Sequence, residues 1–307
     1  MTGRPPTLEG ATATPPVRLA GTIATLRDLL ALTKPGIVTM CLVTTAAGIG
    51  LAPGPVSLTL VAFTLLGTAL AVGGANALNM YLERDGDRLM ERTRRRPLPD
   101  GRIAPAVALS FGIFIAALAL LLLFVLVNPL TGLLAALALD TYVLLYTPLK
   151  RRSHLALLVG AVPGAIPPLI GWTAVTGEIG APGLVLFGVM VLWQISHFLA
   201  IAIYRKNEYA KAGIRVLPLM RGDAPARAHA IAATVLLLPV SLLLFPLGVV
   251  SWIYLAVGLA GGAALMARAI QQLRAARGPR GARRFFVATL LYPPMLLFGL
   301  IADWVLR

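Results

Sequence analysis

The sequence predicts an all-α polytopic membrane protein in which about nine transmembrane helices form one bundle. Of its 307 residues, 58% are hydrophobic and 13% are charged, and the mean hydropathy is +0.84. Soluble domains are nearer about 45–50% apolar and about 25% charged. The apolar residues gather in long runs, and the basic residues fall in the short segments between alternate runs. These observations together predict repeated membrane crossings.

A helix that crosses a bilayer needs about 20 mainly apolar residues. Nine runs fit, and in chain order they span residues 36–53, 57–80, 104–127, 130–147, 155–175, 181–203, 228–248, 249–271 and 285–304. The break at residue 248 is the weakest. Segment 1–30 is rich in Thr and Pro and holds no long apolar run, so we expect a flexible cytoplasmic tail there rather than a cleaved signal. One membrane domain over 31–307 follows it.

The basic residues test this count, because cytoplasmic loops carry an excess of Lys and Arg. All 27 except Arg307 lie in the N-terminal arm or in segments 81–103, 148–154, 204–227 and 268–284. These segments share one side if nine helices alternate in direction. We therefore expect the cell (inner) membrane, with a cytoplasmic N-terminus, an outer C-terminus, Arg94 and Arg152 inside and Glu178 outside. The net charge of +15 comes from these segments between the membrane spans, so it does not indicate a nucleic-acid partner.

The second apolar run ends in a polar stripe, within NALNMYLERDGDRLMERTRRRPLP from residue 76 to 99. Asn76, Asn79, Glu83 and Asp87 stand at helical spacing and share one helix face. Amides inside the apolar zone are costly, which favours a functional role. Mg²⁺ binds in proteins through one or two carboxylates together with substrate phosphates. The pattern therefore indicates a magnesium–diphosphate site, with the neighbouring arginines meeting the remaining phosphate charge. Gly86 is expected to loosen the helix locally.

A second stripe ends the sixth run, WQISHFLAIAIYRKNEYAKAGIRVLPL, through Gln194, His197, Tyr204 and Glu208. Both stripes lead into a basic loop with Leu-Pro and Ala-Pro, as in a weak internal repeat. Two such stripes at one membrane surface predict a charged pocket above an apolar cavity.

Three further features stand within apolar runs. Asp140 is a carboxylate in the middle of the fourth run, which suggests either a function or a protonated group bonded within the bundle. Pro163, Pro167 and Pro168 are expected to break the fifth helix. The glycines beside them favour close packing or a cavity wall. Cys41, the one cysteine, forms no intramolecular disulfide.

At these residues the chain resembles the UbiA-type intramembrane prenyltransferases. The matching stretches are NALNMYLERDGDRLMERTRRRPL, YTPLKRRSHLALLVGAVPGAIPPLIGWTAVTGE, WQISHFLAIAIYRKNEYAKAGIRVLPL and LTKPGI, and the resemblance covers nearly all of the chain beyond residue 30. GAIPPLIGWTAVTG and HF…EYAKAGI point to the branch that farnesylates haem. The resemblance implies a nine-helix bundle whose active-site cavity faces the cytoplasm and opens laterally to lipid.

The resemblance also implies site residues. Asn79, Glu83, Asp87 and Glu208 match the family's catalytic and metal-ligating positions, holding Mg²⁺ through the diphosphate. Glu83 and Glu208 are departures, since Asp is usual at both, and Arg215 stands where Pro is typical. Arg84 and Lys150, then Lys34 and Arg94, are the expected diphosphate partners. His197, Tyr146 and Tyr204 are expected along the haem or substrate cavity, where His197 either ligates haem iron or hydrogen-bonds within the bundle.

The resemblance further implies a reaction that joins farnesyl diphosphate and haem b, with haem b as a substrate. The farnesyl group reaches a haem vinyl group and water adds, giving haem O for terminal oxidase biogenesis. Besides the two substrates and the lipid bilayer, haem A synthase or a terminal oxidase is a candidate partner. Two alternatives stay open: an aromatic prenyltransferase acting on a quinone precursor, and a secondary transporter. Transporter sites lie near the membrane midplane, whereas both stripes here lie at one edge.

Overall fold

The computed structural model describes residues 22–274 and 278–306. Its helices are α1 (Thr22–Leu32), α2 (Pro35–Leu51), α3 (Leu58–Asp87), α4 (Pro105–Leu122), the π-helix η1 (Leu123–Val127), α5 (Pro129–Asp140), the π-helix η2 (Thr141–Tyr146), α6 (Thr147–Leu149), α7 (Ala156–Thr176), α8 (Ala181–Tyr204), α9 (Lys206–Lys211), α10 (Leu217–Met220), α11 (Asp223–Leu242), α12 (Trp252–Arg274) and α13 (Gly278–Leu306). No strand occurs in the described ranges. The predicted all-α class is confirmed.

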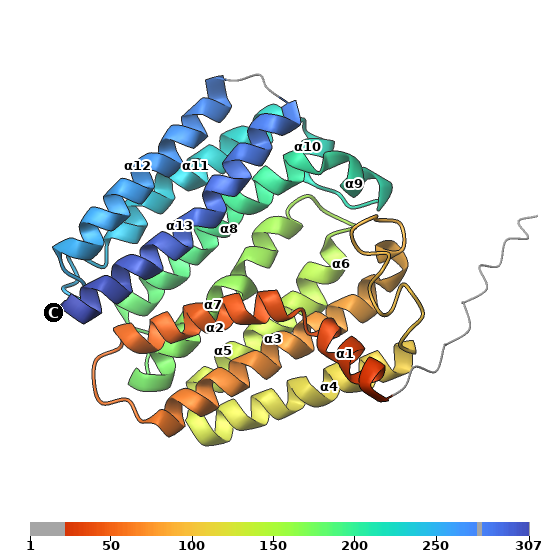
Figure 1. Ribbon diagram of the computed structural model, residues 1–307, viewed down its shortest axis with the longest axis horizontal. Helices are drawn as coiled ribbons and strands as arrows, with labels where there is room; N and C mark the ends of the chain where they lie inside the picture. The colour runs from red at the N-terminus through yellow and green to blue at the C-terminus, as the bar shows by residue number, and fades with distance from the viewer. Residues whose placement is uncertain (1–21, 275–277, 307) are drawn as a thin grey trace, which may run out of the picture.

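The long helices lie roughly side by side in one bundle (Figure 1). Within the described residues, eight helices or helix pairs are long and apolar enough to cross a membrane, and the α1–α2 pair, bent by 51°, makes a ninth if it is counted as one span. The prediction of about nine spans agrees with this range. The seventh helix ends at Leu242 and not at residue 248, because the chain turns between α11 and α12.

Local sequence explains where the helices begin. The Ser57 hydroxyl caps α3 by accepting a hydrogen bond from the Leu60 amide, and the Asn128 side chain caps α5 through the Thr131 amide. Proline occupies the first turn of α2, α4, α5 and α8, where its missing N–H leaves no donor unpaired. Short polar caps thus separate the long apolar runs.

Packing divides the bundle into two groups of helices. In the first group α3 packs against α2 and α4, and α7 packs against α2 and α5. In the second group α8 packs against α11 and α13, and α12 packs against α11 and α13. The contact between α7 and α8 joins the groups, and the site described below lies along this junction.

Helix α7 is continuous through Pro163, Pro167 and Pro168, so the expected break in the fifth helix was wrong. Most of α7 is buried among α2, α5 and α8. A proline inside a buried membrane helix is tolerated because the neighbouring helices hold the backbone in place. The glycines of α7 do provide close packing, because a Cβ on Gly171 would overlap the Thr45 carbonyl of α2.

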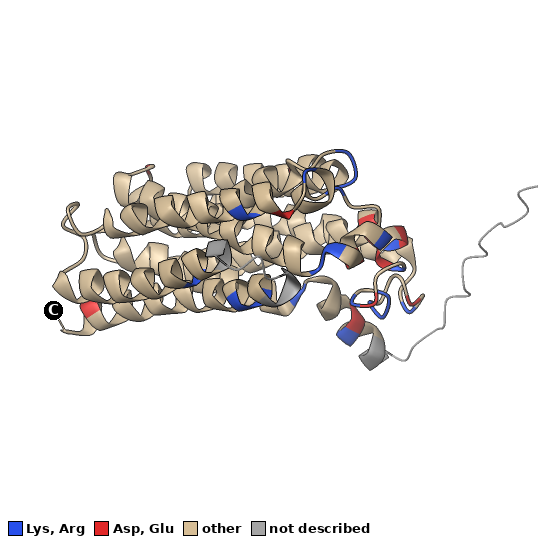
Figure 2. Ribbon diagram, turned by 90° about the horizontal axis from the view of Figure 1, so that it is seen from above, with Lys and Arg blue, Asp and Glu red and all other residues tan. Residues whose placement is uncertain are grey.

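Helix α1 includes the last part of the segment expected to be a flexible tail; residues 1–21 lie outside the described residues. Leu32 is fully buried, and Asp28 forms an ion pair with Arg102 in the connection between α3 and α4. Figure 2 shows the charged residues gathered mainly on the side away from the C-terminus. We call this side the charged end of the bundle.

Candidate active site

The polar stripe of α3 lies on a cavity, as its spacing predicts. Asn76, Asn79, Glu83 and Asp87 all line one cavity of about 370 Å³. The helix runs unbroken to Asp87, so Gly86 does not loosen it. Asn79 is 1% exposed and Asp87 is 2% exposed. Burial at this depth means that each of these polar groups needs a partner within the protein.

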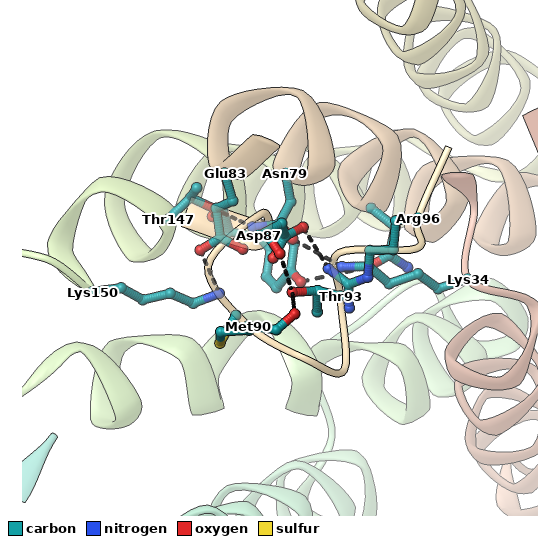
Figure 3. A network of polar contacts seen from close by, with 11 residues as sticks. Lys34, Asn79, Glu83, Asp87, Met90, Thr93, Arg96, Thr147 and Lys150 are labelled. Atoms are coloured by element: carbon teal, nitrogen blue, oxygen red, sulfur yellow. Dashed lines mark hydrogen bonds and ion pairs between the residues drawn. The ribbon is translucent and has the colours of Figure 1, made fainter. Parts of the chain in front are cut away.

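Three of the four stripe residues, Asn79, Glu83 and Asp87, each meet a cation (Figure 3). Lys34 donates to Asn79 Oδ1 at 2.8 Å, and Lys150 Nζ lies 2.8 Å from Glu83 Oε1. Arg96 Nη1 lies 2.7 Å from Asp87 Oδ2. Lys34 reaches this position from the junction of α1 and α2, where its φ is 54°, an uncommon value for a residue with a side chain. The structure thus brings both predicted lysines to the stripe.

Lys150 follows the span that ends at Leu149 and stays charged there. Burial opposes its charge, but Tyr146 and the Glu83 carboxylate outweigh burial and raise the pKa of Lys150 above its usual value. The Lys150 ammonium lies 4.4 Å from the centre of the Tyr146 ring, a favourable cation–π contact. Tyr146 lines the cavity as the sequence predicts.

Two of the four predicted diphosphate partners lie elsewhere. Arg84 donates to the Tyr81 carbonyl and packs over the Tyr81 ring, and Arg94 pairs with Glu91 at the surface. Neither lines the cavity. The arginines that do line it are Arg92, Arg96 and Arg151. A Cβ on Gly86 would overlap the Arg151 guanidinium, so the glycine makes room for this cation.

The second stripe is only half present. Gln194 and His197 line the cavity, but Tyr204 and Glu208 do not. The expected continuous face is wrong because α8 ends at Tyr204 and the chain bends at Arg205 before α9 begins. Glu208 pairs with Arg205, and Tyr204 stacks near Phe286. Tyr209 takes the place expected for Glu208 at the cavity wall.

The segment after α9 is hydrogen-bonded to the backbone at Lys150 and Arg152. The Arg215 amide donates to the Lys150 carbonyl at 3.0 Å, and its guanidinium donates to the Arg152 carbonyl. Proline, the residue that the family pattern leads one to expect at this position, has no N–H for the first bond. The departure at Arg215 therefore ties this segment directly to the residue that pairs with Glu83.

His197 stands deeper in the cavity with its ring fixed on several sides. Its ring stacks on Trp193 at 5.0 Å and packs against Phe286 at 4.8 Å. His197 Nδ1 lies 2.9 Å from Thr289 Oγ1, which itself donates to the Phe286 carbonyl at 2.6 Å. Because that bond uses the single hydroxyl proton, Thr289 accepts from His197 Nδ1–H. The other nitrogen, Nε2, then carries a lone pair.

The rest of the cavity wall is mainly apolar. It includes Ile37, Val72, Leu139, Ile170 and Phe198, together with Pro163 and Pro167 of α7. Asp140 is exposed on the outer surface at the end of α5, which contradicts the alternative of a carboxyl bonded within the bundle. Asp140 does not line the cavity. The cavity thus combines one charged end with an apolar interior.

The oxygen ligands that line the cavity suit a metal ion that is bound partly by the protein and partly by a substrate. No group of three His, Cys, Asp or Glu side chains close enough for a metal occurs in the described part of the chain. Glu83, Asp87 and Asn79 offer hard oxygens on one face, which is the ligand type that Mg²⁺ prefers. With two carboxylates, the remaining ligands must come from another molecule. The residues therefore fit Mg²⁺ bound together with a phosphate compound.

The family model described as UbiA prenyltransferase family matches residues 41–291. The chain belongs to this prenyltransferase family. The match includes α3, α7 and α8, the three long helices that carry most of the cavity wall.

Curated relatives are similar over most of their length. The protoheme IX farnesyltransferase of Sorangium cellulosum (strain So ce56) is 54% identical over 240 residues, which is 78% of this chain and 86% of the relative. The protein of the same name from Anaeromyxobacter sp. (strain Fw109-5) is 50% identical over 274 residues, covering 89% and 92%.

Solved structures share the fold of this UbiA-family chain. A structure described as digeranylgeranylglyceryl phosphate synthase in membranes has a TM-score of 0.76 at 18% identity, over 91% of this chain and 98% of that one. A UbiA homolog from Archaeoglobus fulgidus, bound to DMAPP and Mg²⁺, has a TM-score of 0.64 at 17% identity, over 89% and 99%. At these identities the likeness establishes the helix arrangement alone.

Proposed function

We propose that this chain transfers the farnesyl group of farnesyl diphosphate to a vinyl group of protohaem IX, with addition of water, to give haem O. The relatives at 54% and 50% identity, which carry the name protoheme IX farnesyltransferase, support the two substrates. The observation that carries the proposal in the structure is the cavity itself. Its charged end presents Asn79, Glu83 and Asp87 among five cations, and its interior is apolar.

The charged end would hold the diphosphate. Asn79, Glu83 and Asp87 are the proposed Mg²⁺ ligands, and a bound Mg²⁺ would stabilise negative charge on the departing diphosphate. Use of Mg²⁺ is supported by the Archaeoglobus fulgidus homolog, which binds it with DMAPP. Lys34, Lys150, Arg92, Arg96 and Arg151 would bind the phosphate oxygens that the metal leaves free.

The proposed reaction is balanced with farnesyl diphosphate, haem b and water as its reactants. The bond between C1 of farnesyl and the diphosphate oxygen breaks, and both electrons leave with the oxygen. The vinyl π electrons form the new carbon–carbon bond at C1, which leaves a cation on the carbon beside the porphyrin. Water adds to this carbon and loses a proton. The apolar wall around Ile37, Val72 and Leu139 keeps other water from the allylic cation.

His197 belongs to the haem side of this arrangement. It lines the cavity. The hydrogen bond to Thr289 keeps the imidazole proton on Nδ1, which leaves Nε2 unprotonated. A neutral imidazole nitrogen is a ligand for haem iron. Glu208 and Tyr204, which were expected at the site, have no part in the proposal because neither lines the cavity.

The experiment that tests the function uses purified protein in lipid nanodiscs with haem b, farnesyl diphosphate and Mg²⁺. We expect a haem product whose mass increases by one farnesyl group and one hydroxyl group, and no such product when EDTA is added. A parallel reaction replaces haem b with 4-hydroxybenzoate. Prenylation of that ring, with haem b unchanged, would reject the proposal in favour of an aromatic prenyltransferase.

A further inference from the structure

The Thr147 hydroxyl sits between two polar groups at the charged end. Thr147 Oγ1 lies 2.8 Å from the carbonyl oxygen of Tyr142 and 3.0 Å from Asn79 Nδ2. Thr147 is 5% exposed and Asn79 is 1% exposed. With so little exposure, protein groups and not bulk water determine how the Asn79 amide is oriented.

The direction of each hydrogen bond follows from counting protons. A carbonyl oxygen only accepts, so the single hydroxyl proton of Thr147 is donated to Tyr142. Towards Asn79 the hydroxyl can therefore only accept, and it faces the NH₂ group of the amide. Asn79 Oδ1 then lies on the other side, where Lys34 donates to it at 2.8 Å. The close-up shows Thr147 and Lys34 on different sides of Asn79 (Figure 3).

The backbone holds the Thr147 hydroxyl in place. Residues Thr141–Tyr146 form the π-helix η2, and the Thr147 amide closes it by donating to the same Tyr142 carbonyl. The backbone amide and the side chain of Thr147 thus share one acceptor. A π-helical turn is rare and often accompanies a functional site. Here its effect is to fix a hydroxyl beside α3 with only its lone pairs turned to Asn79.

We propose that Thr147 is a positioning residue that keeps Asn79 Oδ1 turned towards the metal and diphosphate. The proposal rests on the proposed function for the identity of the ligand. Mg²⁺ takes oxygen ligands, so an amide turned by 180° would present a nitrogen and withdraw one ligand. Groups that orient a metal ligand in this way typically affect metal affinity by about 10–100-fold.

The test compares Thr147→Val with Thr147→Ser. Valine keeps the shape but loses the acceptor, and serine keeps the hydroxyl. We expect Thr147→Val to weaken Mn²⁺ binding in the presence of farnesyl diphosphate by about tenfold or more, measured by electron paramagnetic resonance. Thr147→Ser should stay within about threefold of the native chain. The KM for haem b should not change in either variant. Thr64→Val is the matched control, because Thr64 is buried on α3, its hydroxyl donates to the Leu60 carbonyl, and it does not line the cavity.

A double variant separates positioning from general damage. Asn79→Asp supplies two equivalent oxygens, so its orientation no longer depends on Thr147. Adding Thr147→Val to Asn79→Asp should cost little further Mn²⁺ affinity. Equal losses in both backgrounds would mean that Thr147 is structural, and native affinity in Thr147→Val would overturn the proposal. If the native chain makes no haem product but Mn²⁺ binding follows this pattern, the proposed function fails and the positioning role stands.

Discussion

Asp87 lies at the charged end and contacts two neighbouring side chains. It is almost fully buried and pairs with Arg96, and its backbone carbonyl accepts from the Thr93 hydroxyl. We expect Asp87→Ala to lower kcat/KM by about 100-fold or more, since the proposed function makes its carboxylate a Mg²⁺ ligand. Product formation by mass spectrometry measures this.

Glu83→Asp should retain activity, because the shorter side chain still presents a carboxylate with two oxygens. Glu91→Ala, which removes an exposed partner of Arg94, is the matched control and should behave like the native chain. Native turnover in Asp87→Ala, or full activity in EDTA, would contradict the assignment of the metal site.

Substitution of Gly86 gives a second prediction for a single residue. In Gly86→Ala the new Cβ meets the far end of the flexible Arg151 side chain, so the guanidinium moves and the helix stays folded. We expect the KM for farnesyl diphosphate to rise by about tenfold, from the loss of one charge-assisted hydrogen bond. Gly50→Ala, whose Cβ meets nothing within 4 Å, should leave the KM unchanged. Equal KM values would mean that Arg151 does not touch the diphosphate.

At the residue scale, sequence spacing located the α3 stripe but not all of its partners. Helical periodicity was sufficient for Asn79, Glu83 and Asp87, because α3 is regular to its end. Arg96 and Arg151 lie on irregular connections, so periodicity gave no reason to prefer them to Arg84 and Arg94. Glycine at position 86 was the available signal, since it marks a close approach as readily as a flexible helix.

Among the elements, the crossing of α2 and α7 sets one wall of the cavity. A Cβ on Gly48 would overlap the Pro168 carbonyl, and one on Gly171 would overlap the Thr45 carbonyl. Both obstacles are backbone atoms, which cannot move aside as a side chain does. We expect Gly48→Ala to lower the free energy of unfolding by about 1–3 kcal/mol.

Thermal unfolding in detergent, followed by circular dichroism, measures this effect. Gly50→Ala on the same helix faces open space and should not lower the melting temperature. A melting temperature in Gly48→Ala equal to that of the native chain would show that the two helices separate easily, and that the contact does not define the cavity wall.

The apolar runs predicted the long helices well, because one requirement of length and hydropathy governs each of them. The continuity of two helices was predicted wrongly, and the two errors have opposite causes. Pro163, Pro167 and Pro168 act against a helix locally, and only burial among other helices overrides that preference. Conversely, the spacing from Gln194 to Glu208 extrapolated a helix beyond Tyr204, where the run of apolar residues has already ended.

For the whole molecule, the basic residues predict its orientation in the membrane. Arg152 lies at the charged end, and Glu178 lies beyond the opposite end of α7. In a Cys41→Ser background, we expect Arg152→Cys to react with an impermeant thiol reagent only from the cytoplasmic side. Glu178→Cys should react only from the other side, because cytoplasmic segments carry the Lys and Arg. Reaction of position 178 from the cytoplasm would overturn the nine-span topology.

The cations that contact the α3 stripe affect the order in which a divalent ion and a diphosphate bind at the site. Lys34, Lys150 and Arg96 each contact one oxygen of Asn79, Glu83 and Asp87, respectively. A divalent ion arriving alone would compete with these positive groups for the carboxylates and would be repelled by them. A diphosphate arriving with the ion gives the displaced cations new partners. The two ligands should therefore be strongly linked, and each should raise the affinity for the other by the same factor. Mg²⁺ would then bind the protein weakly until the prenyl diphosphate is present. The allylic bond would be activated only when the cavity contains both ligands.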